Sequence, residues 1–288
     1  MTATARRIQE PQDSSTVVEG EFAFSNAHFV QIKALLYEDS GIHLPDSKAT
    51  LVYSRLAKRL RRLGLSSFAD YCALVGGPDG AGERREMMSL LTTNVTRFFR
   101  EPHHFDHLAE RLPKWAAAGR TRLWSAGCST GQEPYSMALT VLTAGPDAAE
   151  RDIRILATDI DPVVVAHAAA GVYSDEAAES LPPDVRRTCL KRDDNGWRID
   201  ERVRQLIAFK ELNLMQSWPM RGRFQAIFCR NVAIYFDDAT QELLWRRFAP
   251  LTAPHGRLYV GHSERVDDPG FQSCGLTAYR RHAPGGQS

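Results

Sequence analysis

The sequence is poor in residues that could cross-link a fold through disulfides or a bound metal. It has only five cysteines in 288 residues, an odd number with no CxxC pair, so neither a zinc site nor a disulfide framework is supported. They are Cys72, Cys128, Cys189, Cys229 and Cys274. Reduced thiols, as in a cytoplasmic protein, are the simpler interpretation.

Long apolar runs and an excess of one charge are also missing. No stretch approaches the roughly 20 apolar residues that span a bilayer, and the start, MTATARRIQEPQDSS, lacks the apolar run of a signal peptide. Lys and Arg number 36 against 35 Asp and Glu, so the formal net charge is only +1. This net charge excludes a long-range electrostatic attraction of the whole protein to nucleic acid or membranes. We expect a cytoplasmic globular protein without membrane insertion, whose charged partners meet a local patch.

Hydrophobic patterning divides the chain. Residues 1–20 are polar and are predicted to be a disordered lead-in. Residues 21–91 have helical spacing throughout and predict a small all-α domain. The repeat is clearest at Leu51, Leu56, Leu60 and Leu63, and Ser66 and Ser67 are good caps for the next helix. Residues 92–120 are expected to link this domain to the next.

Strands alternate with helices in residues 121–283, which predicts a parallel α/β sheet covered on both faces. The predicted strands are Thr121–Ala126, Ile153–Thr158, Phe224–Cys229 and Arg257–Gly261. The predicted helices are Glu133–Thr143, Pro162–Ala170 and Asp238–Phe248. Residues 172–212 are irregular. Because Asp194-Asn195-Gly196 is a hairpin signal, with extended runs at Trp197–Ile199 and Val203–Phe209, we expect a small antiparallel β insertion there.

The first predicted strand leads into a nucleotide-binding type of turn, Ser125–Gly131 (SAGCSTG). Glycine allows a sharp turn and close approach of a ligand, although the full GxGxxG spacing is absent. Asp159 ends the second strand, where a carboxylate can accept hydrogen bonds from ribose hydroxyls. Asp161 is the better helix cap. Without a GK[ST] lysine a triphosphate is disfavoured, and methyl transfer is favoured over hydride transfer, with both left open.

Four longer motifs carry a family resemblance. They are TTNVTRFFRE (92–101), STGQEPYS (129–136), FCRNVAIYF (228–236) and GHSE (261–264). In order and spacing, from Phe22 to Tyr279, they resemble the CheR family of chemoreceptor glutamate methyltransferases. Gln132 stands where that family more often has Glu, and Ala233 replaces a larger apolar residue. The resemblance implies a seven-stranded Rossmann-like class I methyltransferase domain with a β insertion, preceded by an all-α domain.

The resemblance also implies a site for S-adenosyl-L-methionine, which becomes S-adenosyl-L-homocysteine, with no metal. Cofactor contacts are expected from Asn94, Thr96, Arg100, Ala126, Gly127, Glu133, Asp159, Asn213, Leu214, Arg230 and Asn231. Arg100 and Tyr235 are the expected catalytic residues, acting on the acceptor carboxylate. Their structural alternatives are an ion pair of Arg100 with Glu101 or Glu133 and an aromatic anchor at Tyr235. A glutamate acceptor is already ionised at neutral pH, so no general base is required.

A basic helical stretch is the local patch that a neutral protein would need. Its candidate docking residues are Arg55, Lys58, Arg59 and Arg62. The alternatives are a solvated cationic face or phosphate-backbone binding, which the lack of interleaved aromatics disfavours. By resemblance, the patch docks the acidic methylation helices of chemotaxis receptors, and the protein is expected to be a monomer. The insertion turn Lys191–Gly196 lacks the Gly-x-Gly of relatives that grip a receptor peptide, so we expect receptor binding without that tether.

Two rival functions stay open at this point. One is a methyltransferase for RNA or a small molecule, although the DPPY-type loop of amino-group methylating enzymes is absent and Arg230-Asn231-Val232 stands there instead. The other is a non-catalytic module that binds the cofactor and signals through the helical domain. Turnover separates the second from an enzyme.

Overall fold

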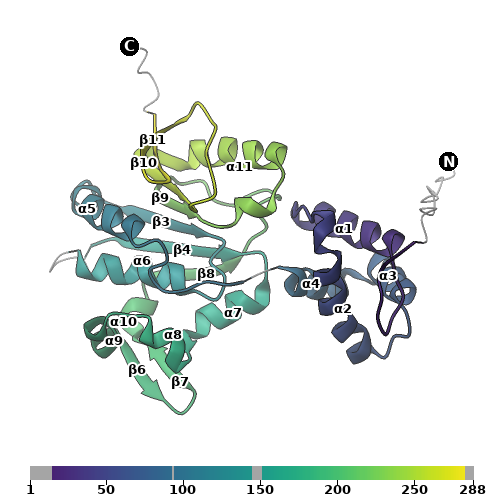
Figure 1. Cartoon of the computed structure of the whole chain (residues 1–288). Coiled ribbons are helices and arrows are strands. Elements are labelled where there is room, and N and C mark those ends of the chain that lie inside the picture. The colour runs from purple at the N-terminus through teal and green to yellow at the C-terminus, as the bar shows by residue number, and fades with distance from the viewer. Residues whose placement is uncertain (1–14, 93, 145–150, 283–288) are drawn as a thin grey trace. The chain divides into compact units, whose positions relative to one another are not determined.

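The computed structural model describes residues 15–92, 94–144 and 151–282. The chain divides into two compact units, residues 1–93 and 94–288, so the division falls at the start of the predicted linker (Figure 1). Within the described ranges, no helix has the length and apolar character that crossing a membrane requires.

The first unit confirms the predicted all-α domain. Its helices are α1 (Asn26–Ser40), α2 (Ala49–Leu63), α3 (Phe68–Gly76) and α4 (Ala81–Leu91), with a short 3-10 helix η1 (Asp46–Lys48). Strand β1 (Thr16–Val18) pairs antiparallel with β2 (Phe24–Ser25). The prediction of a disordered lead-in is therefore wrong for Thr16–Val18. Residues 1–14 lie outside the described residues.

Local signals explain where these helices begin. Ser25 and Ser67 cap α1 and α3, each accepting a hydrogen bond from a backbone N–H of the first turn, as predicted for Ser67. Phe24 and Phe68 pack in the core with ring centroids 4.4 Å apart. Leu63, the last leucine of the predicted repeat, is exposed, because it occupies the last turn before Gly64 ends the helix.

The second unit contains the predicted seven-stranded sheet. Its strands are β3 (Thr121–Ala126), β4 (Ile153–Asp159), β8 (Ile207–Glu211), β9 (Phe224–Cys229), β10 (Thr252–Val260), β11 (Phe271–Gly275) and β12 (Ala278–Arg281). The order is β11-β12-β10-β9-β3-β4-β8, and β12 is antiparallel to both neighbours. β3 lies between β4 and β9, so the chain order reverses beside it. Ligands of such sheets bind at the carboxyl ends of the strands around this reversal.

Four helices accompany the sheet. They are α5 (His103–Ala117), α6 (Gln132–Thr143), α7 (Pro162–Ala170) and α11 (Asp238–Leu251). The segment predicted as a linker thus contains a helix, α5, whose residues Phe105, Leu108 and Leu112 join the core of this unit. α6 is buried along most of its length, as expected for a helix packed beneath other elements.

The β insertion is present but smaller than predicted. It contains β5 (Val172–Tyr173), α8 (Asp175–Glu179), α9 (Pro183–Cys189), β6 (Leu190–Asp193), β7 (Gly196–Ile199) and α10 (Glu201–Arg204). The three strands are antiparallel in the order β5-β7-β6, and Figure 1 shows α8, α9 and α10 grouped with β6 and β7 beside the large sheet. Of the extended run predicted at Val203–Phe209, only Ile207–Phe209 is extended, and its assignment to the insertion is wrong. Val203 lies in α10, and β8 pairs in parallel with β4 in the large sheet.

Candidate functional site

The candidate site includes the glycine turn after β3. The backbone N–H groups of Gly127 and Cys128 both donate to Thr158 O, at 2.8 Å each, which ties the turn to the end of β4. Gly127 has φ 103°, and a Cβ there would lie 2.3 Å from Val232 Cγ2. The position therefore requires glycine both for its backbone angle and for the close approach of the loop that follows β9.

Asp161, and not Asp159, caps the helix that follows β4, as predicted. Asp161 caps α7 by accepting from the N–H of Val163 at 2.9 Å. The Asp159 carboxylate accepts from the backbone N–H of Ser129 at 2.8 Å and of Asp161 at 3.1 Å. Burial raises the pKa of Asp159, while these backbone N–H groups oppose the shift. Asp159 thus fixes the turn after β3 and retains lone pairs for a ligand.

Glu133, in the first turn of α6, points toward the same sheet edge. Its Oε1 accepts from Ser125 Oγ at 2.7 Å, and its Oε2 lies 3.6 Å from Arg230 Nη1. Burial raises the pKa of Glu133, and Arg230 opposes that shift. A partly buried carboxylate of this kind is suited to bind a cationic ligand group.

Arg230 lies at the end of β9 with its guanidinium turned inward. Its Nη2 is 3.5 Å from Glu101 Oε2 and also donates to the backbone oxygen of Arg100. The guanidinium lies over the ring of Phe105, 5.4 Å from its centroid. The ion pairs with Glu101 and Glu133, considered above as alternatives for Arg100, are thus made by Arg230. Arg100 is partly buried and donates to Val95 O at 3.2 Å.

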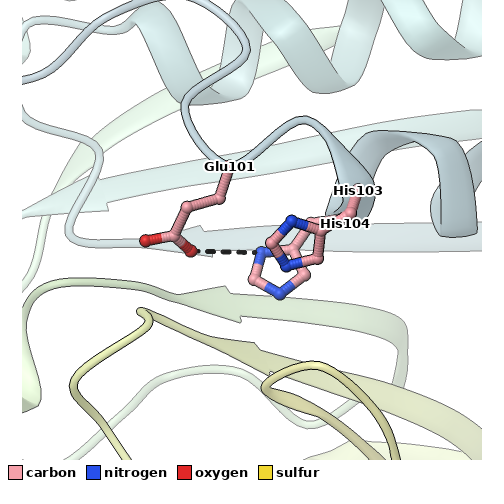
Figure 2. Close-up of side chains that lie close together, drawn as sticks. All are labelled: Glu101, His103 and His104. Carbon is pink, nitrogen blue, oxygen red and sulfur yellow. Dashed lines mark ion pairs between the residues drawn. The ribbon is translucent and has the colours of Figure 1, made fainter.

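Figure 2 shows Glu101 and His104 facing each other beside His103, with ligand-type atoms of all three within 4.8 Å of one another. Burial lowers the pKa of His104 to about 3, so its ring is neutral, and its Nε2 lies 3.1 Å from Leu276 O. The positive charge near Glu101 already comes from Arg230. A divalent cation would have to bind close to that guanidinium, where like charges repel. We therefore assign Glu101 to an ion pair with Arg230, with His104 as its neutral neighbour.

The first residues of the second unit contribute backbone to the site. Ser129 Oγ donates to Asn94 O at 3.1 Å, which brings Asn94 beside the turn after β3, and Thr96 is partly buried nearby in sequence. Six described non-glycine residues of this unit have a positive φ, and four of them lie in these loops: Phe99, Glu101, Ser129 and Asn231. Such angles cost energy and concentrate at functional sites. Here they belong to three of the motifs identified from the sequence.

Asn213 and Leu214 follow β8 and reach the same edge. Leu212 N donates to Asp159 O at 2.9 Å, which places this loop beside the end of β4. Asn213 Oδ1 accepts from Met215 N at 2.8 Å, and Leu214 is buried. The loop is therefore held in a fixed turn next to Asp159.

Asn231 and Tyr235 lie in the loop after β9, in which Ala233–Tyr235 forms a 3-10 helix, η3. A residue that the sequence did not single out organises this loop. The buried Glu264 carboxylate accepts from the backbone N–H groups of Asn231, Val232 and Ile234 at 2.8, 2.9 and 3.1 Å, and also from that of Gly261. The position of Glu264 just beyond a buried strand is a sequence signal that could have drawn attention to it. Its partners lie in a distant motif, so the sequence could not have identified them.

The candidate docking residues all lie on α2 in the first unit, where the structure separates them into two pairs. Arg55 donates to Leu90 O and Thr92 O, both at 2.8 Å, and Arg59 forms a two-pronged ion pair with Glu83 at 2.9 and 2.7 Å. Lys58 and Arg62 are exposed. Two of the four thus stabilise the packing of α2 on α4, and two present charge to solvent.

Comparison with known proteins identifies the family. Residues 94–279 match the family described as CheR methyltransferase, SAM binding domain, and residues 27–92 match CheR methyltransferase, all-alpha domain. A probable chemotaxis protein methyltransferase of Rhizobium etli is 51% identical, covering 85% of this chain and 96% of that protein. The chemotaxis protein methyltransferase of Escherichia coli K12 is 43% identical, over 89% and 91%. The chain therefore belongs to the CheR methyltransferase family, with an all-α domain followed by an S-adenosylmethionine-binding domain.

Proposed function

We propose that this protein transfers a methyl group from S-adenosylmethionine to glutamate side-chain carboxylates of chemotaxis receptors, leaving a methyl ester and S-adenosylhomocysteine. The observation that carries the proposal is the pair of partly buried carboxylates, Glu133 and Asp159, on either side of the Gly127 turn. The relatives named as chemotaxis protein methyltransferases support an acceptor that belongs to chemotaxis.

The residues at the sheet edge fit this cofactor, which supplies the methyl group on a positively charged sulfonium. Glu133 would hold the cationic amino group, and Asp159 the ribose hydroxyls. Asn213 and Leu214 would frame the adenine. The remaining contacts would come from Asn94, Thr96, Arg100, Ala126, Gly127, Arg230 and Asn231. Because the Arg230 side chain points inward, we propose that its guanidinium positions Glu133 and that its backbone makes the contact with the cofactor.

The acceptor side needs alignment more than proton transfer. A glutamate carboxylate is ionised at neutral pH, so no base has to remove a proton. Arg100 has a planar fork of N–H donors that suits a carboxylate, and Tyr235 would orient the acceptor oxygen. Bringing the oxygen in line with the methyl carbon and sulfur is the main contribution left to the protein.

The test is incubation of the purified protein with radiolabelled S-adenosylmethionine and receptor-bearing membranes. We expect label on receptor glutamates that is released by base, and its loss in Tyr235→Phe and Arg100→Ala. Glu242→Gln, on the exposed side of α11, is the matched control and should keep the activity. Label on RNA instead of receptor would contradict the proposed acceptor. Cofactor binding without transfer to any acceptor would favour a non-catalytic module.

For receptor docking we propose Lys58 and Arg62 as the charges that meet the acidic receptor helices, with Arg55 and Arg59 holding α2 in place. Charge reversal at both exposed positions should raise the KM for receptor about tenfold and leave cofactor affinity unchanged. Lys114→Glu, an exposed lysine of α5, is the control. An unchanged KM in the double variant would contradict this docking face. Addition of receptor C-terminal peptide should not inhibit, because the insertion turn lacks Gly-x-Gly.

A further inference from the structure

The turn after β10 places one carboxylate against the loop that carries Tyr235. Glu264 is only 3% exposed, and the N–H of Glu264 donates to Gly261 O at 2.9 Å, which closes the turn. From there its side chain reaches the segment Asn231–Ile234. Helix α11 and strand β10 separate these two segments in the sequence, so the contact between them is tertiary.

Each oxygen of Glu264 is used twice. Oε2 accepts from Asn231 N at 2.8 Å and from Gly261 N, and Oε1 accepts from Val232 N at 2.9 Å and Ile234 N at 3.1 Å. Only an ionised carboxylate offers acceptors on both oxygens. In a glutamine, whichever oxygen became the amide nitrogen would face two backbone donors. Leaving buried donors unpaired is costly, so the site is specific for the carboxylate.

The conformation of this loop is one that few residues adopt. Asn231 has φ 59°, in the left-handed region that is uncommon for residues other than glycine and that asparagine tolerates better than most. A Cβ on Gly261 would lie 2.4 Å from Asn231 Nδ2, so the two turns are in close contact. Tyr235 N donates to Val232 O at 3.1 Å, which continues the turn that the Glu264 bonds begin. The direction of the Tyr235 side chain thus depends on a backbone that Glu264 holds.

We propose that Glu264 is a positioning residue for methyl transfer, whose carboxylate fixes the loop 231–235 so that Tyr235 can orient the acceptor. This inference rests on the function proposed above for Tyr235. Glu264 itself contacts neither substrate nor cofactor in this account. It acts through four backbone N–H groups.

A double-mutant cycle tests the proposal. Glu264→Gln and Tyr235→Phe should each lower kcat at saturating cofactor by about 10²-fold, as small misplacements of reacting groups do. If Glu264 acts through Tyr235, the double variant should be no slower than the slower single variant. Losses that multiply to about 10⁴-fold would overturn the proposal. Glu264→Asp, which keeps the carboxylate on a shorter stem, should recover part of the rate, and Glu242→Gln is the control for removal of an acidic charge.

Two measurements keep the test decisive. If Glu264→Gln does not fold, the cycle is run with Glu264→Asp, and amide exchange of Val232 and Ile234 is measured in the unaltered protein. Protection should exceed that of exposed loop amides by at least about 10²-fold, and rapid exchange of both amides would overturn the proposal. Failure of the proposed function would look different. The unaltered protein would then form no methyl ester, or Tyr235→Phe would react at the normal rate.

Discussion

The edge of the large sheet and the β insertion use the same charged residue types in opposite ways. At the sheet edge, Arg230 and Glu264 are buried, and each contacts several groups from different segments. In the insertion the pairs are exposed and mostly local, such as Arg198 with Asp193 and Arg187 with Asp184. Exposed pairs are screened and contribute little, whereas buried charges must be compensated. Charge in the first region therefore fixes geometry, and in the second it mainly keeps the surface polar.

The largest effect should come from the same substitution in the two regions. Arg230→Met would leave Glu101 and Glu133 buried beside an apolar side chain. Breaking a buried pair in this way costs about 3–5 kcal/mol of unfolding free energy. Arg198→Met, in an exposed pair, should change stability only slightly. Chemical denaturation of both variants measures the difference, and equal losses would break the contrast between the regions.

Glu133→Gln should separate ligand binding from stability within the sheet edge. The glutamine oxygen can still accept from Ser125, but the charge for a cationic ligand group is lost. Hydrogen bonds to charged groups contribute about 1.5–3 kcal/mol, so S-adenosylhomocysteine affinity should fall about 10- to 100-fold. Calorimetric titration measures it, with Glu242→Gln as the exposed control. An unchanged affinity would remove Glu133 from the cofactor site.

What could be predicted from the sequence follows from how local each interaction is. The roles of Asp159 and Asp161 are set within a few residues by a strand end and a helix start, and the structure confirms the cap. The hairpin turn at Asn195-Gly196 is likewise local. The pairing of Arg230 with Glu101, and of Glu264 with the backbone at Asn231, depends on which strands are neighbours. No pattern within either motif contains that information.

The error at β8 has the same origin. Ile207–Glu211 is extended, as predicted for most of its length, but its partner is β4 and not the hairpin. An edge strand that follows an insertion has the same alternation as a strand inside it. Only the register with Ile155–Asp159 assigns it to the large sheet, and that register brings Asn213 and Leu214 beside Asp159.

The pH dependence of cofactor binding sharpens the comparison in a third way. Burial raises the pKa of Glu133 and of Asp159 from the ordinary carboxyl values. On acidification these groups therefore take up protons in the free protein at a higher pH than ordinary carboxyls do, and a cationic ligand group then binds less well. Affinity for S-adenosylhomocysteine should therefore decrease on acidification. In Glu133→Gln the dependence should be shallower, because only Asp159 still titrates, and an identical slope would contradict the assignment.

The smallest effect is expected in the insertion, where Asp193→Asn isolates one exposed ion pair. Asp193 Oδ1 accepts from Asn195 N at 2.8 Å in the hairpin turn, and Oδ2 accepts from Arg198 at 2.8 Å. Asparagine keeps the first bond and loses the charge of the second. The backbone N–H of Asn195 and, to a smaller extent, the Arg198 bond lower the pKa of Asp193, so the stability that these bonds contribute is present at neutral pH and is lost as the pH falls through the lowered pKa. Because both partners are exposed, we expect no measurable change in melting temperature at pH 7. A clear loss would show that the insertion, like the sheet edge, depends on its charges for structure.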